Sequence, residues 1–233
     1  MAAPVHHGNV ESALDRIYRN RFSPEERAAK QALWKVLCGS FFNPRYLTRD
    51  ATVVDLGAGY CDFINQATAA RRFAVDINPD TAEFAAPGVE VLATPLESLA
   101  EALGPNSVDV AFASNVFEHL RGPDVLLTVL DAVRTVLKSG GRLIIMQPNV
   151  RVLGGAFWDF FDHTLPLSER GMAEALTTSG FQIEECRARF LPYTTKGVLP
   201  TSASLARFYL ALPPIWWLLG KQMLVVARKP SEA

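Results

Sequence analysis

The sequence of 233 residues contains few cysteines and almost no net charge, and each shortage excludes a class of protein. The three cysteines, Cys38, Cys61 and Cys186, are far apart and form no Cys-x-x-Cys pair. This pattern argues against a disulfide framework or a zinc site, and it favours a reducing compartment such as the cytoplasm. The net charge of −1 leaves no excess of lysine and arginine for binding a phosphate backbone, so we expect no nucleic-acid partner.

Long apolar runs are also missing. The longest apolar stretch, residues 208–219, contains Pro213 and Pro214 and is shorter than the roughly 20 residues that a transmembrane helix needs. Residues 1–11 lack an apolar segment, so we expect no signal peptide. Because 49% of the residues are nevertheless hydrophobic, the composition indicates one globular domain with additions and a sizeable core.

Short apolar runs alternate with stretches long enough for helices. A capping box of Ser23 and Glu26 marks the start of the first helix. The other predicted helices span residues 61–69, 124–137 and 168–179, with Asp124 and Ser168 as caps and glycines at 140–141 and 180 ending the last two. Strands are predicted at residues 52–56, 72–76, 89–92, 108–113, 142–146, 181–189 and 223–227.

This alternation of strands and helices predicts parallel βαβ units. We expect an α/β fold with a Rossmann-like, doubly wound, mostly parallel seven-stranded sheet. An N-terminal helical cap would occupy residues 1–50, and the main domain would occupy residues 51–233 with insertions at 150–168 and 190–220. Open sheets of this kind bind ligands at the carboxyl ends of their strands, so the turns after the strands are the places to search for chemistry.

The turn after the first strand is rich in glycine. Gly57 and Gly59 in the segment Asp55-Leu56-Gly57-Ala58-Gly59 allow a sharp turn and a close approach of the backbone to a ligand. The dinucleotide fingerprint GxGxxG would place its third glycine at Asp62. A carboxylate at that position repels a pyrophosphate but not a cationic or zwitterionic ligand.

The segment Asp55–Gly59 resembles the first motif of the class I S-adenosylmethionine-dependent methyltransferases, and Asp76 resembles the acid with which that family holds the ribose hydroxyls. Residues 113–120 and 137–143 resemble two later motifs, so the resemblance covers residues 53–149. It implies S-adenosylmethionine as the cofactor. The cofactor-binding residues that it implies are Asp55, Gly57, Ala58, Gly59, Asp76, Ile77, Leu96 and Asn115.

The chain departs from the family pattern at two positions. Cys61 stands where the family often has a third glycine, a change that is tolerable because the first two glycines make the close approach. The family also often has an acid near the adenine, where this chain reads Ala93-Thr94-Pro95-Leu96-Glu97. Each implied residue also has a purely structural interpretation: the glycines would only form a tight turn, Asp76 would only cap the next helix, and Asn115 would only be a turn residue.

Candidate catalytic residues come from the four histidines of the chain. A hydroxyl acceptor of a methyl group usually needs a base to remove its proton. His163 is the first candidate, because it lies among aromatic and acidic residues just after the fifth strand; the alternative is a structural hydrogen bond to the backbone. His119, after the fourth strand, is the second candidate. We expect no metal, because Asn115 stands where a ligating acid would help a metal-assisted mechanism.

The acceptor side of the chain also resembles a bacterial methyltransferase subgroup that is often associated with glycan or secondary-metabolite biosynthesis. This resemblance rests on the aspartate–histidine segment and on residues 190–196 and 220–222, and it implies a small or lipid-linked acceptor. The leading hypothesis is methyl transfer to an oxygen atom. The alternatives are N- or C-methylation, a cofactor-binding regulator without activity, and a nicotinamide-dependent oxidoreductase, which Asp62 disfavours. Residues 208–219 are expected to be a buried connection to the last strand, or else a lid or membrane-surface contact.

Overall fold

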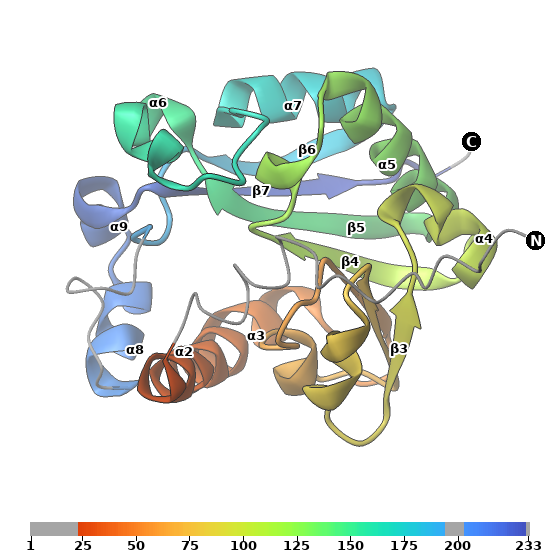
Figure 1. Ribbon diagram of the computed structural model, residues 1–233, viewed down its shortest axis with the longest axis horizontal. Coiled ribbons are helices and arrows are strands. Elements are labelled where there is room, and N and C mark those ends of the chain that lie inside the picture. The colour runs from red at the N-terminus through yellow and green to blue at the C-terminus, as the bar shows by residue number, and fades with distance from the viewer. Residues whose placement is uncertain (1–22, 194–202, 232–233) are drawn as a thin grey trace, which may run out of the picture.

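The computed structural model describes residues 23–193 and 203–231, and its centre is a seven-stranded sheet (Figure 1). The strand order is β3-β2-β1-β4-β5-β7-β6, and every pairing is parallel except the two that β7 makes with β5 and β6. This arrangement confirms the expected fold class. The strands are β1 (Thr52–Leu56), β2 (Arg71–Asp76), β3 (Val89–Ala93), β4 (Val108–Ser114), β5 (Leu137–Pro148), β6 (Gln182–Arg187) and β7 (Gln222–Arg228).

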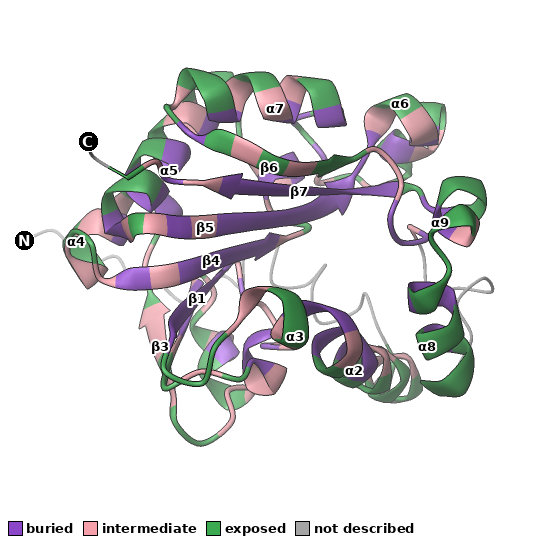
Figure 2. Cartoon of the chain, turned by 180° about the vertical axis from the view of Figure 1, so that it is seen from behind, coloured by how far each residue is buried: buried purple, intermediate pink, exposed green. Residues whose placement is uncertain are grey.

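Helices cover both faces of the sheet, and each face has its own apolar core. One face packs against α2 (Pro24–Leu37), α8 (Ala203–Ala211) and α9 (Pro213–Leu219), and α2 contacts α8 directly. The other face packs against α5 (Pro123–Val136) and α7 (Glu169–Thr178). The strands between these layers are almost wholly buried at the sheet centre (Figure 2). The shorter elements are a π-helical turn (Cys38–Phe42), α3 (Asn43–Tyr46), α4 (Leu99–Leu103), α6 (Val150–Leu153) and 3-10 helices at Ile64–Gln66, Pro79–Glu83, Leu96–Ser98, Phe117–His119 and Gly154–Asp159.

Several helix ends follow the capping residues in the sequence, and one helix does not. The capping box of Ser23 and Glu26 is formed, and the Ser168 hydroxyl accepts a hydrogen bond from the backbone N–H of Gly171. The prediction for α5 is wrong at both ends. Its N-cap is Gly122 rather than Asp124, and it ends at Val136 because Leu137 is already extended and pairs with Val108 across a bulge. Strand β5 therefore starts before the glycines that were expected to close the helix.

The helix expected at residues 61–69 is absent from the structure. The segment consists of turns and one 3-10 helix at Ile64–Gln66. Asn65 explains the difference, because its amide donates to the backbone oxygen of Phe84 and its carbonyl accepts from the N–H of Ala86, both at 2.8 Å. These bonds hold the segment against a neighbouring loop. No long helix therefore begins at the glycine-rich turn, and the backbone N–H groups of Gly57, Ala58 and Gly59 are bonded within the protein.

Residues 208–219 form parts of two helices with a break before Pro213. The interpretation as a buried connection is wrong for much of this stretch: Trp216 is buried, but Trp217 is 74% exposed, Leu218 is 68% exposed and Phe208 is 56% exposed. One side of each helix packs against the core, and the other side faces solvent. Over the described ranges, no helix is both long and apolar enough to cross a membrane.

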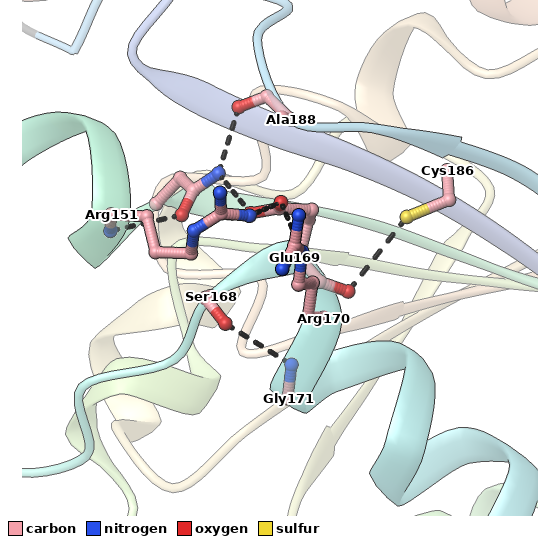
Figure 3. Close-up of polar contacts among 8 residues, drawn as sticks. Arg151, Ser168, Glu169, Arg170, Gly171, Cys186 and Ala188 are labelled. Carbon is pink, nitrogen blue, oxygen red and sulfur yellow. Dashed lines mark hydrogen bonds and ion pairs between the residues drawn. The ribbon is translucent and has the colours of Figure 1, made fainter.

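A buried polar cluster fixes the chain where β5 ends and α7 begins (Figure 3). The Asn149 amide donates to the Glu169 carboxylate at 2.7 Å and to the backbone oxygen of Ala188 at 2.9 Å. Arg151 also binds the Glu169 carboxylate. Asn149 is fully buried and Glu169 nearly so, hence the bond between their side chains is shielded from water, and the cluster holds the ends of the 150–168 loop in place. That loop carries His163.

An aromatic cluster joins the N-terminal helix to the sheet. Trp34 of α2 packs edge-on against Phe112 of β4 with 5.9 Å between ring centroids, and Phe63 stacks on Phe112 at 3.7 Å. Phe42 lies 5.1 Å from the same ring. Because one β4 side chain contacts residues from three preceding segments, α2 packs as part of the same core as the sheet.

Replacement of this central ring is expected to destabilise the whole chain. Phe112→Ala removes a fully buried aromatic side chain and should lower the free energy of unfolding by about 3–5 kcal/mol. Phe161→Ala is the matched control, because that ring is 91% exposed, and it should change stability by less than about 0.5 kcal/mol. Urea unfolding followed by circular dichroism measures both. Equal stability of the two variants would contradict the packing described here.

Candidate active site

Two adjoining cavities open at the carboxyl ends of the parallel strands. They have volumes of about 350 and 360 Å³ and share Gly59 and Tyr60 in their walls. The first is lined by Asp76 and by the residues that follow β2, and the second runs from the glycine-rich turn to His163. The combined crevice lies where open α/β sheets bind ligands, and its size suits a cofactor together with a small molecule.

The glycine-rich turn requires glycine at its first position. Gly57 has a φ of +64°, and a Cβ atom there would lie 2.4 Å from Cγ2 of Val116, in the turn after β4. Gly59 has a φ of +48°, but a Cβ atom there would meet open space. Gly57 is therefore needed for the close approach of two turns, and Gly59 for the backbone conformation. The close approach at Gly57 and the positive φ at Gly59 belong to the folded chain itself, so the two glycines are needed for the fold as well as for the crevice.

Cys61 continues the same turn and has a φ of +57°, a conformation that favours glycine. The turn therefore needs a third residue with positive φ besides the two glycines. This backbone conformation explains why the similar family often has a third glycine at this position. The Cys61 side chain is buried, and its thiol lies 3.7 Å from the backbone oxygen of Thr81. Burial raises the pKa of this thiol to about 12, so Cys61 is a packing residue rather than a nucleophile.

Asp76 links the turn after β1 to the turn after β2. Its carboxylate accepts hydrogen bonds from the backbone N–H of Gly59 at 2.7 Å and of Asn78 at 2.9 Å. The interpretation of Asp76 as a simple helix cap is wrong, because Asn78 caps the following 3-10 helix with its own side chain. A carboxylate oriented by two backbone donors at a cavity wall can accept further hydrogen bonds from ligand hydroxyls.

Three acidic side chains, Asp55, Asp62 and Asp76, surround the turn and line the crevice. Burial raises the pKa of Asp55 well above its usual range, and the neighbouring charges of Asp62 and Asp76 raise it further. Burial also raises the pKa of Asp62, although Lys30 approaches it at 3.2 Å and opposes the shift. A positively charged ligand relieves this repulsion, whereas a pyrophosphate increases it. The residues of the turn therefore fit the sulfonium and ammonium groups of S-adenosylmethionine.

The implied cofactor residues do not all reach the crevice. Ala58 and Asn115 line the second cavity, and Asn115 is also a turn residue with a φ of +53°. Ile77 is 68% exposed, and Leu96 is buried in the core beneath α5. Neither Ile77 nor Leu96 is among the described residues that line the two cavities. Their contact with the adenine stays a prediction from the sequence.

The far end of the second cavity brings together the two candidate histidines, although they are distant in sequence. The ring centroids of His119 and His163 are 5.1 Å apart, and both rings line the cavity. His163 is buried and its Nδ1 lies 2.8 Å from the backbone oxygen of Phe157. This is the structural hydrogen bond that the sequence left open, and it does not occupy Nε2. Glu118, buried beside His119, lines the same end of the cavity.

Sequence reasoning missed the part of the crevice that α2 supplies. Trp34 and Leu37 line the second cavity, and Arg27 lies over the rings of Tyr60 and Phe84 at 4.5 and 4.6 Å from their centroids. Leu33, Leu37 and Phe41 recur every four residues in the sequence, but this period does not tell which surface the helix covers. The expected N-terminal cap is thus a wall of the site.

Comparisons with known proteins agree with this geometry. Residues 54–145 match a family model described as a methyltransferase domain, whereas no curated protein matches the sequence. A putative methyltransferase of Haloferax volcanii, solved in a complex with the methyltransferase activator Trm112, has a TM-score of 0.67 and 16% identity, covering 95% of this chain and 99% of that one. An S-adenosylmethionine-dependent methyltransferase of Archaeoglobus fulgidus has a TM-score of 0.63 and 18% identity, with coverage of 92% and 98%.

A third structure is a possible histamine N-methyltransferase of Thermotoga maritima, with a TM-score of 0.64 and 17% identity over 91% of this chain and 97% of that one. At such identities these structures show the shared fold. The matched family model identifies residues 54–145 as a methyltransferase domain. The finer questions of acceptor and mechanism rest on the crevice itself.

Removal of the Asp76 carboxylate is expected to weaken cofactor binding. A charge-assisted hydrogen bond contributes about 1.5–3 kcal/mol, so Asp76→Ala should reduce the affinity for S-adenosylhomocysteine roughly tenfold or more. Calorimetric titration measures this effect, and Asp124→Ala, at an exposed position on α5, is the control. Asp76→Asn keeps an acceptor for the N–H of Gly59 and separates the loss of charge from the loss of the turn. Unchanged affinity in both Asp76 variants would show that this side chain only shapes the backbone.

Proposed function

We propose that the protein transfers a methyl group to an oxygen atom of a small-molecule acceptor, such as a hydroxyl of a sugar, a lipid-linked glycan or a secondary metabolite. The observation that carries this proposal is the polar end of the second cavity, where His119 and His163 meet beyond the glycine-rich turn. A cofactor bound at the turn would leave this end for the acceptor. The cavity volume of about 360 Å³ favours a small molecule over a folded protein or a nucleic acid.

The methyl transfer needs little from the protein beyond position and charge. When bound, S-adenosylmethionine supplies an electrophilic methyl group on a sulfonium sulfur. The walls of the second cavity combine apolar surfaces, including Leu37 and Leu191, with polar groups at one end. Such walls hold an acceptor in line with the methyl group and exclude water.

A polar acceptor is supported by Gln222, which begins β7 and lines the cavity. Its side-chain amide donates to the backbone oxygen of Pro192 at 2.9 Å. Its Oε1 atom is buried without a hydrogen-bond partner among the described residues. A buried acceptor of this kind is costly unless a donor reaches it. An acceptor molecule with a second hydroxyl or amine would satisfy Gln222 while it presents its reacting oxygen to the histidines.

His163 is proposed as the base that takes the proton of the reacting hydroxyl. The carbonyl of Phe157 accepts a hydrogen bond from Nδ1, so the proton of the neutral ring lies on Nδ1 and the lone pair lies on Nε2. The rings of Phe157 and Phe160 hold the imidazole in place, with centroids at 4.6 and 5.1 Å. A fixed ring with its lone pair on one known atom is suited to proton transfer, and His119 is the second candidate for this role.

Two other outcomes are open to the same test. Methylation of a nitrogen or carbon atom would use the same crevice with less need for a base, and a chain that binds the cofactor without turnover would act as a regulator. The assignment to glycan or secondary-metabolite biosynthesis and the contact of residues 208–219 with a membrane surface remain predictions from the sequence. Apolar side chains exposed on α8 and α9 are compatible with such a contact.

His163→Asn separates catalysis from binding. An asparagine amide can still donate to the Phe157 oxygen, so the loop should keep its shape. Turnover should fall by about 10²–10⁴-fold while the affinity for S-adenosylhomocysteine stays unchanged. The assay uses S-adenosylmethionine with a labelled methyl group and an acceptor found by screening sugars, phenols and amines with the unaltered protein. Asp159→Asn, at an exposed position of the same loop, is the control. Near-normal turnover of His163→Asn would exclude His163 as the base.

A further inference from the structure

We propose that Glu118, His119 and His163 form a binding site for a divalent transition-metal ion of the zinc type. Each residue offers one ligand atom, and these three atoms all lie within 4.8 Å of one another. Glu118 and His163 are buried, and His119 is partly buried. A buried group of one carboxylate and two imidazoles at such distances is the donor set of many mononuclear metal sites.

Backbone hydrogen bonds hold the two halves of this site together. The 150–168 loop carries His163, and the turn after β4 carries the other two residues. The N–H groups of Thr164 and Leu165 both donate to the backbone oxygen of Glu118, at 2.8 and 3.0 Å. The Thr164 hydroxyl also donates to the backbone oxygen of Leu120 at 2.7 Å. The position of His163 relative to Glu118 is therefore fixed by the main chain, and a metal site needs such rigidity.

Both imidazoles are oriented as metal ligands usually are. His163 directs Nδ1 to the backbone oxygen of Phe157 at 2.8 Å, and His119 directs Nδ1 to the backbone oxygen of Asp162 at 3.0 Å. A carbonyl oxygen only accepts hydrogen bonds, so each Nδ1 carries the proton and each Nε2 carries the lone pair. Metal-bound histidines characteristically make this second hydrogen bond, which fixes the tautomer and the ring orientation. The carboxylate of Asp162, 3.4 Å from Nδ1 of His119, reinforces it.

The donor set and its surroundings indicate the type of ion. Two nitrogen ligands suit zinc and its first-row neighbours better than magnesium or calcium, which prefer oxygen ligands. Three protein ligands leave at least one coordination position, and all three residues line the second cavity. An ion there would be reached through the crevice and could bind an oxygen atom of a small molecule. Three ligands and an open position are typical of catalytic rather than structural zinc sites.

This inference differs from the expectation that no metal binds. That expectation considered only Asn115, on the turn after β4, whereas the third ligand comes from the loop after β5 and becomes visible once the chain is folded. The inference concerns the same cavity as the proposed function but does not depend on methyl transfer. Because one lone pair on Nε2 of His163 cannot hold both a proton and an ion, the ion-bound protein would not use His163 as a base.

Zinc binding tests the site directly. The full chain, stripped with a chelator that is then removed, is titrated calorimetrically with zinc chloride, and we expect one ion per chain at this site. His163→Asn and His119→Gln should each weaken this binding by at least about 100-fold, more than the loss of an outer-sphere partner. Matched controls are His6→Ala with His7→Ala, and Cys186→Ser, which remove other zinc-binding side chains and should leave this affinity unchanged. The proposal would be overturned if the control variants lost zinc affinity while the His119 and His163 variants kept it.

Cobalt(II) provides a second measurement that needs no variant. Bound at this site in the unaltered protein, it should show visible absorption bands of nitrogen and oxygen ligation without a thiolate charge-transfer band. A thiolate band, or no change in the cobalt spectrum, would overturn the proposal even where a variant fails to fold. Each variant is also titrated with S-adenosylhomocysteine. If the protein binds S-adenosylhomocysteine but no metal, this inference is refuted and the proposed function stands. If it binds the metal but not S-adenosylhomocysteine, only the proposed function is refuted.

Discussion

The hydrogen bond from the Gly59 N–H to the Asp76 carboxylate, 2.7 Å long, is the contact on which the crevice depends. It joins the turn after β1 to the turn after β2, while Gly57 packs against Val116 and joins the first turn to the one after β4. Three neighbouring parallel strands thus deliver their turns to one place. The cost is a group of carboxylates whose mutual repulsion is partly offset by Lys30. A cationic ligand would complete this balance, which is why we propose a sulfonium cofactor.

The acceptor end of the crevice is built by a different means. It depends on the 150–168 loop, whose two ends are fixed by the buried cluster around Asn149 and Glu169 (Figure 3). Thr164 and Leu165 of this loop are bonded to the backbone of Glu118. This loop makes neighbours of two histidines that are remote in sequence. Rigid support of this kind is required both for a general base and for a metal ligand, since each must hold a ring nitrogen in one position.

The sequence was sufficient for the fold class and insufficient for the acceptor end. At the cofactor end, Ile77 and Leu96 were implied as binding residues but are not among the described residues that line the two cavities. Strands with continuous apolar runs and helices with clear caps were predicted correctly, because those signals are local. The helix at residues 61–69 failed because Asn65 bonds to a distant loop, and the end of α5 failed because pairing between Leu137 and Val108 overrides the glycines. The grouping of Glu118 with both histidines, and the wall supplied by α2, arise from tertiary packing that no local pattern reports.

Calorimetric titration of the unaltered protein with S-adenosylmethionine, S-adenosylhomocysteine and NAD tests the central claim most directly. The acidic side chains around the glycine-rich turn favour a cationic or zwitterionic ligand over a pyrophosphate. The two adenosyl-sulfur compounds should therefore bind and compete with each other, and NAD should give no heat of binding. Tight binding of NAD without binding of either sulfur compound would contradict the account.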